Sequence, residues 1–243
     1  MSDSSESKNG PKKQAAPRKA KPKVEAQTEK KPEPPGDDVL KAAVLEAALP
    51  QAAFDGFTDR VLETAATDAG VSAAELTRLF PEGPLALVEF YSLSVDKEMD
   101  ERLAAMDLPS MKIRARIAEA VKTRLAILRR HKEAARRAAA LLSLPMHAGL
   151  AARLMYRSVD AMWRAAGDTA TDFNFYSKRG ILAGVYGSTL VRWFADASPD
   201  EAATNEFLAA RIENVMQFEK FKAKAKDALS NFPAFANWGK PKG

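Results

Sequence analysis

Cysteine is absent from this 243-residue chain, and long apolar runs are absent as well. Without cysteine there is no disulfide, no thiolate metal site and no cysteine nucleophile, which fits a reducing compartment. No apolar run approaches the roughly 20 residues that a membrane-spanning helix needs. The first thirty residues also lack the apolar core of a signal peptide. We therefore expect a cytoplasmic protein of bacterial origin.

Histidine is scarce, and the motifs that carry catalysis are missing. The two histidines are His131 and His147, and neither has a glutamate three residues before it, as a carboxylate-bridged di-iron site would require. No glycine-rich phosphate loop and no G-x-S-x-G elbow occurs. We expect both histidines to lie at helix ends or in a loop. The sequence thus predicts no enzyme activity, no metal site and no cofactor.

Runs of β-branched residues are also missing, whereas alanine, leucine, arginine, lysine and glutamate recur throughout. Hydrophobic residues make up 46% of the chain, enough for a substantial core, so the sequence predicts an all-α protein. Residues 1–36 form a Lys/Pro/Ala-rich tail that has almost nothing to bury, and we expect it to be disordered. A solubilising role is its plain interpretation, and loose binding of nucleic acid or anionic lipid is the alternative.

Periodicity and capping signals predict the helices. Ser72 and Glu75 have the spacing of a capping box, and Pro50 is expected to end the first helix. Ser198-Pro199-Asp200-Glu201 combines an N-cap serine, a proline at the first helical position and a glutamate at the third. The predicted helices span about 37–50, 58–69, 72–80, 85–105, 110–130, 130–142, 150–166, 173–195 and 198 to beyond 216.

Residues 37–91 have the outline of a helix-turn-helix, with a tight turn through Gly70. Three helices followed by a longer bundle resemble the TetR-type regulators, in which such a head joins a ligand-binding body. Binding DNA requires lysine and arginine to neutralise phosphates. Between residues 38 and 90, however, nine acidic residues stand against three basic ones, a balance of −6: Asp38, Glu46, Asp55, Asp59, Glu63, Asp68, Glu75, Glu82 and Glu89 against Lys41, Arg60 and Arg78. We expect a retained scaffold with no specific DNA partner; a TetR-type transcriptional regulator with an apolar effector is the alternative.

A second and more specific resemblance lies between Asp172 and Val215. It is carried by three motifs: "DFNFYSKRGILAGVY", which begins at Asp172, "DASPD", which begins at Asp196, and "FLAARIEN", which ends at Asn214. With these motifs the chain resembles the ubiquinone-biosynthesis lipid-binding accessory family, whose best-known members assist the demethoxyubiquinone hydroxylase. Weaker similarity to the same family reaches back to about Asp38. The resemblance implies a TetR-like helical bundle, an apolar cavity for an isoprenoid, quinone or phospholipid ligand, and a C-terminal amphipathic helix. It also implies contact with the hydroxylase, and this fold commonly forms a homodimer through its last two body helices.

The body, residues 92–216, is rich in large apolar side chains between Leu150 and Phe194. Gly180, Gly184 and Ser188 recur every four residues and predict a groove along one helix face. A lipid cavity is our interpretation, because flexible methionines and small residues favour adaptable apolar cavities, and a solid helical core is the alternative. The expected lipid-binding residues are Leu154, Met155, Met162, Trp163, Phe175, Tyr176, Leu182, Val185 and Tyr186.

Residues 217–243 combine aromatic residues at helical spacing with lysines on the flanks and the opposite face. Such a helix suits the surface of an anionic membrane, here the inner membrane, to which the protein would bind peripherally. A helix folded back onto the body is the alternative. The expected membrane-binding residues are Phe218, Phe221, Leu229, Phe232, Lys220, Lys222, Lys224 and Lys226.

The partner surface implied by the resemblance falls on Trp193, Phe194, Asn205, Leu208 and Arg211. Many eukaryotic members carry a tryptophan where this chain has Asn205, so Trp193 and Phe194 are expected to take over as the aromatic anchor. The arginines between residues 111 and 140 alternate with apolar positions. An exposed basic face is their plain interpretation, and a surface for anionic lipid or an acidic partner is the alternative.

Overall fold

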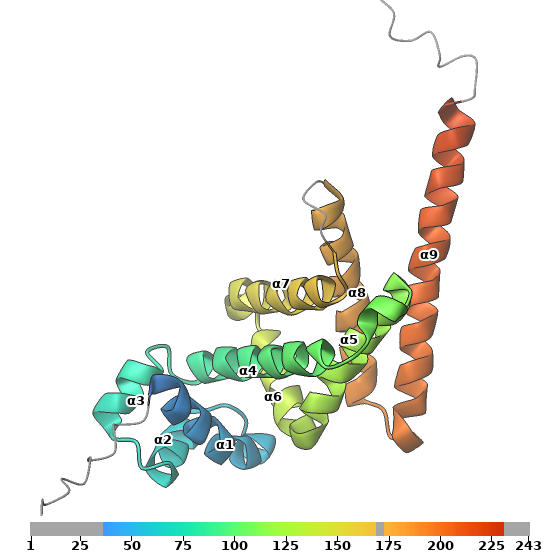
Figure 1. Cartoon of the computed structure of the whole chain (residues 1–243). Coiled ribbons are helices and arrows are strands. Elements are labelled where there is room, and N and C mark those ends of the chain that lie inside the picture. The colour runs from blue at the N-terminus through green and yellow to red at the C-terminus, as the bar shows by residue number, and fades with distance from the viewer. Residues whose placement is uncertain (1–35, 169–172, 231–243) are drawn as a thin grey trace, which may run out of the picture. The chain divides into compact units, whose positions relative to one another are not determined.

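The structure, a computed structural model, describes residues 36–168 and 173–230, and within these ranges the regular structure is helical (Figure 1). The all-α prediction is confirmed. The α-helices are α1 (Asp37–Asp55), α2 (Asp59–Asp68), α3 (Ala73–Leu79), α4 (Pro84–Ala104), α5 (Ile113–Leu128), α6 (Lys132–Leu142), α7 (Ala148–Ala165), α8 (Phe173–Phe194) and α9 (Ala202–Ser230). Short 3-10 turns occupy residues 108–110, 129–131, 145–147 and 199–201.

The helix-turn-helix head is built as its local signals predict. The Thr58 hydroxyl accepts a hydrogen bond from the Val61 amide and caps α2. Ser72 and Glu75 form both halves of the predicted capping box, which starts α3. Gly70 has a φ of 69°, the left-handed conformation that glycine tolerates best and that the tight turn requires. Local capping and turn signals therefore build the connection between α2 and α3.

The first helix does not end at Pro50, and this prediction was wrong. α1 continues to Asp55 and ends at Gly56, whose φ of 76° stops it and whose amide donates to the Ala52 carbonyl. Proline inside a helix removes one backbone hydrogen bond and costs roughly 3 kcal/mol. Leu49 and Ala52, on either side of Pro50, are fully buried where α1 packs against α2 and α6. Burial of these neighbours offsets the lost hydrogen bond.

The helix α4 links the head to the body, and it crosses the boundary expected at residue 91 without a break. Its residues Tyr91, Val95, Met99 and Leu103 recur every four positions and are all buried. In the body α4 packs against α5 and α7, α7 packs against α8, and α8 packs against α9 (Figure 1). Helices α5 and α9 are also in contact, so α5, α7, α8 and α9 surround a common interior.

The last helix starts later than the SPDE signal predicts. Asp200 and Glu201 have positive φ values of 51° and 55°, and α9 begins at Ala202. The Glu201 carboxylate accepts a hydrogen bond from Trp193 Nε1 at 2.7 Å, so it cannot turn back to close a capping box at Ser198. Asp196 instead accepts from the Thr204 amide at 2.8 Å, while the Ser198 hydroxyl accepts from the Ala203 amide. The cap is therefore shared between Asp196 and Ser198.

Candidate functional site

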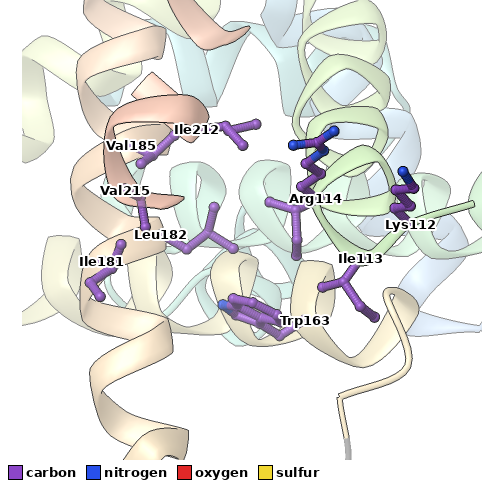
Figure 2. A pocket seen from close by; sticks show the side chains of 10 residues that line it. Lys112, Ile113, Arg114, Trp163, Ile181, Leu182, Val185, Ile212 and Val215 are labelled. Atoms are coloured by element: carbon purple, nitrogen blue, oxygen red, sulfur yellow. The ribbon is translucent and has the colours of Figure 1, made fainter. Parts of the chain in front are cut away.

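An apolar cavity of about 440 Å³ lies between α5, α7, α8 and α9, and we call it the first cavity. Figure 2 shows the side chains of α8 and α9 facing those of α5 across it, with Trp163 of α7 between the two groups. Its lining consists of Ile113, Ile117, Trp163, Ile181, Leu182, Val185, Ile212 and Val215, together with the charged residues Lys112 and Arg114. Such a lining accepts hydrocarbon and offers almost no polar partners.

Helical spacing explains why these residues meet. Ile113 and Ile117 are four residues apart on α5, and Ile212 and Val215 are three apart on α9, so each pair lies on one helix face. Part of the glycine groove exists as well, because Gly184 and Ser188 line a space of about 390 Å³ between α8 and α9. The contributions of α5 and α9 were missed by the sequence analysis. Their i, i+3 and i, i+4 apolar spacing was the signal that could have found them.

A second cavity of about 250 Å³ lies between α4, α5, α6, α7 and α8, and we call it the second cavity. Leu154, Met155, Leu190 and Phe194 supply apolar walls, and three alanines of α6 leave the space open. A group of polar residues lines the same cavity: Tyr91, Ser92, Arg124, Ser143, Ser158 and Tyr186. The second cavity therefore differs from the first in combining apolar walls with buried polar groups.

Arg124 organises that polar group. Its Nε donates to Asp96 at 2.7 Å, one terminal nitrogen donates to the Tyr186 hydroxyl, and the other donates to Ser92 at 3.1 Å. The Ser158 hydroxyl donates to the second carboxylate oxygen of Asp96 at 2.9 Å. Arg124 belongs to the basic stretch expected to be an exposed face, and this expectation fails for it. Arg124 lies three residues after Val121 on the apolar stripe of α5, which is why it points inward.

The Lys178-Arg179 pair of the "DFNFYSKR" word fastens the start of α8 to the end of α7. Lys178 bonds to Asp168 at 2.7 Å, and the buried Arg179 bonds to Asp160 at 2.6 Å and to Asp168 at 3.3 Å. Trp163 Nε1 donates to the Lys178 carbonyl at 3.2 Å. These contacts hold the Trp163 ring against the first cavity, so this part of the motif positions the cavity wall.

The "DASPD" word shapes the junction of α8 and α9. Hydrogen bonds from Ser198 and Thr204 lower the pKa of the Asp196 carboxyl well below its ordinary value. Lys132 donates to the Asp196 carbonyl at 3.0 Å, and its ammonium group lies 4.8 Å from the centre of the Trp193 ring. Arg129 forms a two-pronged contact with Glu201, at 3.0 and 2.8 Å. The junction is thus tied to α6 and to the 3-10 turn that precedes it, and these contacts hold the start of α9, which forms one wall of the first cavity.

The expected lipid-binding residues divide between the two cavities. Trp163, Leu182 and Val185 line the first cavity, whereas Leu154, Met155 and Tyr186 line the second. Met162 is fully buried in the core, and Tyr176 is 69% exposed. The side chain of Phe175 lies outside the described residues.

The expected partner residues are not all on the surface. Trp193 and Leu208 are buried within the chain, so the structure offers neither as a surface anchor; the reason is that both pack where α8 meets α9. Phe194 is half-buried and lines the second cavity. Asn205 donates to the Asp200 carbonyl at 3.2 Å, and the exposed Arg211 lies over the Phe207 ring.

The expected membrane-binding side chains, from Phe218 to Phe232, lie outside the side chains that the structure describes. The backbone of α9 nevertheless continues to Ser230, which confirms a helix beyond residue 216. Across residues 36–168 and 173–230, no single helix is long and apolar enough to cross a membrane. Two consecutive segments, Ile113–Leu142 and Pro145–Ala165, together have the length and composition of a membrane span, but they meet at a bend of 91°.

In the head, two of the three basic residues are held by acidic neighbours. Arg78 of α3 makes a two-pronged contact with Asp37, at 2.6 and 2.9 Å, and Arg60 contacts Asp55 at 2.7 Å. The contact with Asp37 further raises the pKa of the Arg78 guanidinium. An arginine that is already paired with a carboxylate gains less free energy from contact with a DNA phosphate, because the existing ion pair must first be broken. The helix that would read DNA therefore presents little free positive charge.

The arrangement of these helices is the TetR-like fold. A TetR transcriptional regulator from Nitrosomonas europaea superimposes with a TM-score of 0.59, covering 72% of this chain and 97% of the regulator at 18% sequence identity.

Sequence comparison places the chain more narrowly. Residues 148–219 match the family model for COQ9. The mitochondrial ubiquinone biosynthesis protein COQ9 of Bos taurus is 31% identical over 186 residues, and that of Homo sapiens is 30% identical over 186 residues. Each alignment covers 74% of this chain and 58% of the relative, so the chain spans less than two thirds of the length of the proteins it matches. The chain is therefore similar to the COQ9 family, most specifically over residues 148–219.

Proposed function

We propose that this protein is a non-catalytic, lipid-binding accessory protein of ubiquinone biosynthesis. It binds an isoprenoid or quinone-precursor lipid and presents it to the demethoxyubiquinone hydroxylase at the membrane surface. The observation that carries this proposal is the first cavity, whose apolar lining residues from four helices leave about 440 Å³ open. That volume falls within the range of roughly 300–1,000 Å³ typical of small-molecule sites. The relatives' names supply the pathway.

The head supports this proposal over a transcriptional regulator. Its acidic balance and the pairing of Arg78 with Asp37 disfavour approach to a polyanion. We propose that the head serves as a scaffold, and that the segment 217–243 docks the protein on an anionic membrane. The partner surface would include Asn205 and Arg211, and a homodimer would form through α8 and α9, where Val191 is exposed.

Lipid extraction and native mass spectrometry of the purified protein test the proposal. Val185 lines the first cavity, so Val185→Phe should fill it and lower the amount of co-purified lipid. Val39→Phe adds the same bulk at a position of α1 that is 62% exposed and should leave the bound lipid unchanged. Circular dichroism of both variants checks that they fold. Lipid-free wild-type protein, or equal occupancy in both variants, would contradict the proposal.

A further inference from the structure

The second cavity presents hydrogen-bond donors in one corner. Tyr91 and Ser92 of α4, Arg124 of α5 and Tyr186 of α8 all line it, and we call these four residues the donor corner. Asp96, which accepts from Arg124, does not line the cavity. The carboxylate therefore lies behind the corner, and the residues that line the space are those that carry the guanidinium and the hydroxyls.

Several donor hydrogens of the corner have no acceptor among the described residues. The Tyr186 hydroxyl accepts from Arg124 and keeps its own hydrogen to donate, and the Tyr91 hydroxyl contacts no described hydrogen-bonding group. Arg124 carries five N–H groups, of which three are used by Asp96, Tyr186 and Ser92. Burial raises the pKa of Tyr91 to about 12, so this phenol remains a donor at neutral pH. The donor corner thus has hydrogen-bond donors to spare, and the oxygen atoms of a ligand could accept from them.

The charge of the corner decides which acceptors fit. Arg124 and Asp96 are both buried and neutralise one another. A carboxylate or phosphate entering the second cavity would add an unbalanced buried charge, which costs several kcal/mol unless it is paired. A neutral head with carbonyl, ether or hydroxyl oxygens brings acceptors without that cost. Tyr91, Tyr186 and Phe194 also make part of the lining aromatic, which suits contact with a planar ring.

We propose that Tyr91, Arg124 and Tyr186 bind the neutral, oxygen-bearing ring of an amphipathic ligand in the second cavity. The size agrees, because about 250 Å³ is below the range of roughly 300–1,000 Å³ for complete small-molecule ligands and suits a head group alone. This inference rests on the proposed function, because it identifies which part of the bound lipid would form hydrogen bonds with the protein. The second cavity then determines ligand specificity, and the apolar chain of the ligand packs against hydrocarbon-lined space.

Three probes that share a decyl chain test this site on the full-length protein: a decyl-substituted dimethoxybenzoquinone, decylbenzene and 4-decylbenzoate. Binding of each probe is measured by isothermal titration calorimetry at pH 7. The wild-type protein should prefer the quinone to both other probes. Tyr91→Phe and Tyr186→Phe should each weaken quinone binding about three- to tenfold, the worth of a neutral hydrogen bond, and leave decylbenzene binding unchanged. Tyr156→Phe, which removes a hydroxyl from a residue that does not line the second cavity, is the matched control and should have no effect.

The outcomes separate the two proposals. Equal binding of the quinone and decylbenzene by the wild type, or unchanged quinone binding in both Tyr91→Phe and Tyr186→Phe, overturns the donor corner while the apolar site remains. Failure of every probe to bind, together with lipid-free purified protein, overturns the proposed function itself. Thermal unfolding of each variant identifies any loss that stems from misfolding. Tyr91→Phe is the cleaner variant, because the Tyr186 hydroxyl accepts from Arg124 whereas the Tyr91 hydroxyl bonds to no side chain within residues 36–168 and 173–230.

Discussion

Arg124 of α5 and Asp96 of α4 form a buried ion pair, with Nε and a carboxylate oxygen 2.7 Å apart and side chains only 7% and 10% exposed. Taking two charges out of water is costly, and their attraction repays the cost only when further hydrogen bonds satisfy both groups. Here Ser92, Ser158 and Tyr186 provide those bonds. The pair therefore joins α4, α5, α7 and α8 at one point beside the second cavity.

Removing one partner of this pair should destabilise the protein strongly. Asp96→Ala leaves the Arg124 charge buried and unpaired, and we expect it to lower the free energy of unfolding by about 3–5 kcal/mol. Glu133→Ala breaks an exposed pair with Arg136 and should cost less than about 1 kcal/mol. Urea denaturation of both variants measures the difference. Equal losses would show that the Arg124–Asp96 pair is not desolvated as the structure has it.

Asp196 should make stability depend on acid pH. Its folded-state pKa is lowered mainly by hydrogen bonds from Ser198 and Thr204, so its contribution is complete above its ordinary pKa of 3.8 and is lost as pH falls from there toward the lowered value. Asp196→Ala removes this group. The difference in unfolding free energy between wild type and Asp196→Ala should therefore be largest near neutral pH and shrink below about pH 4. A difference that stays constant between pH 2 and pH 7 would exclude this role.

Replacing Pro50 should stabilise the protein. Pro50→Ala restores a backbone donor inside α1 and removes a helix-interior proline, whose cost of roughly 3 kcal/mol is partly offset by the greater freedom of the unfolded alanine chain. We expect a net gain of about 2 kcal/mol in the free energy of unfolding. Pro84→Ala is the control, because Pro84 is the first residue of α4 and no helical hydrogen bond is lost there. A loss of stability in Pro50→Ala would mean that its ring packs better than an alanine can.

Local signals predicted much of the fold because they act over a few residues. The Ser72–Glu75 capping box and the turn at Gly70 depend only on neighbours in the chain, and both occur as expected. Pro50 misled the sequence analysis because its local penalty is overcome by long-range burial of Leu49 and Ala52. Glu201 misled it because a distant tryptophan side chain takes the carboxylate that a capping box needs.

The candidate site was predicted only in part for the same reason. The apolar richness of α7 and α8 pointed to a cavity, and Trp163, Leu182 and Val185 do line one. A single-helix pattern does not say which other helices complete the wall, so Ile117 and Ile212 were missed. Periodicity likewise did not show that a space between helices divides into two cavities, or that an arginine on an apolar stripe is neutralised by Asp96.

The head should fail to bind DNA specifically. Its acidic balance opposes a polyanion, and Arg78 is held by Asp37. A gel-shift assay at low salt with random and genomic fragments should show no submicromolar specific complex. A specific complex that disappears in Arg78→Ala but persists in Arg136→Ala, an exposed arginine outside the head, would favour the transcriptional regulator instead.

Membrane docking is the remaining prediction, and it depends on the segment 217–243. Lysine near an anionic surface contributes about 1 kcal/mol per residue, so the lysines of this segment supply enough attraction for peripheral binding when aromatic residues also enter the interface. Deleting residues 217–243 should abolish co-sedimentation with vesicles that contain anionic lipid. A full-length variant with four lysines reversed should also lose binding, and it separates the effect of charge from that of truncation. Its substitutions are Lys220→Glu, Lys222→Glu, Lys224→Glu and Lys226→Glu. Wild-type binding should fall as salt rises, because exposed charges are screened. Unchanged sedimentation of both variants would show that the protein reaches membranes through another surface.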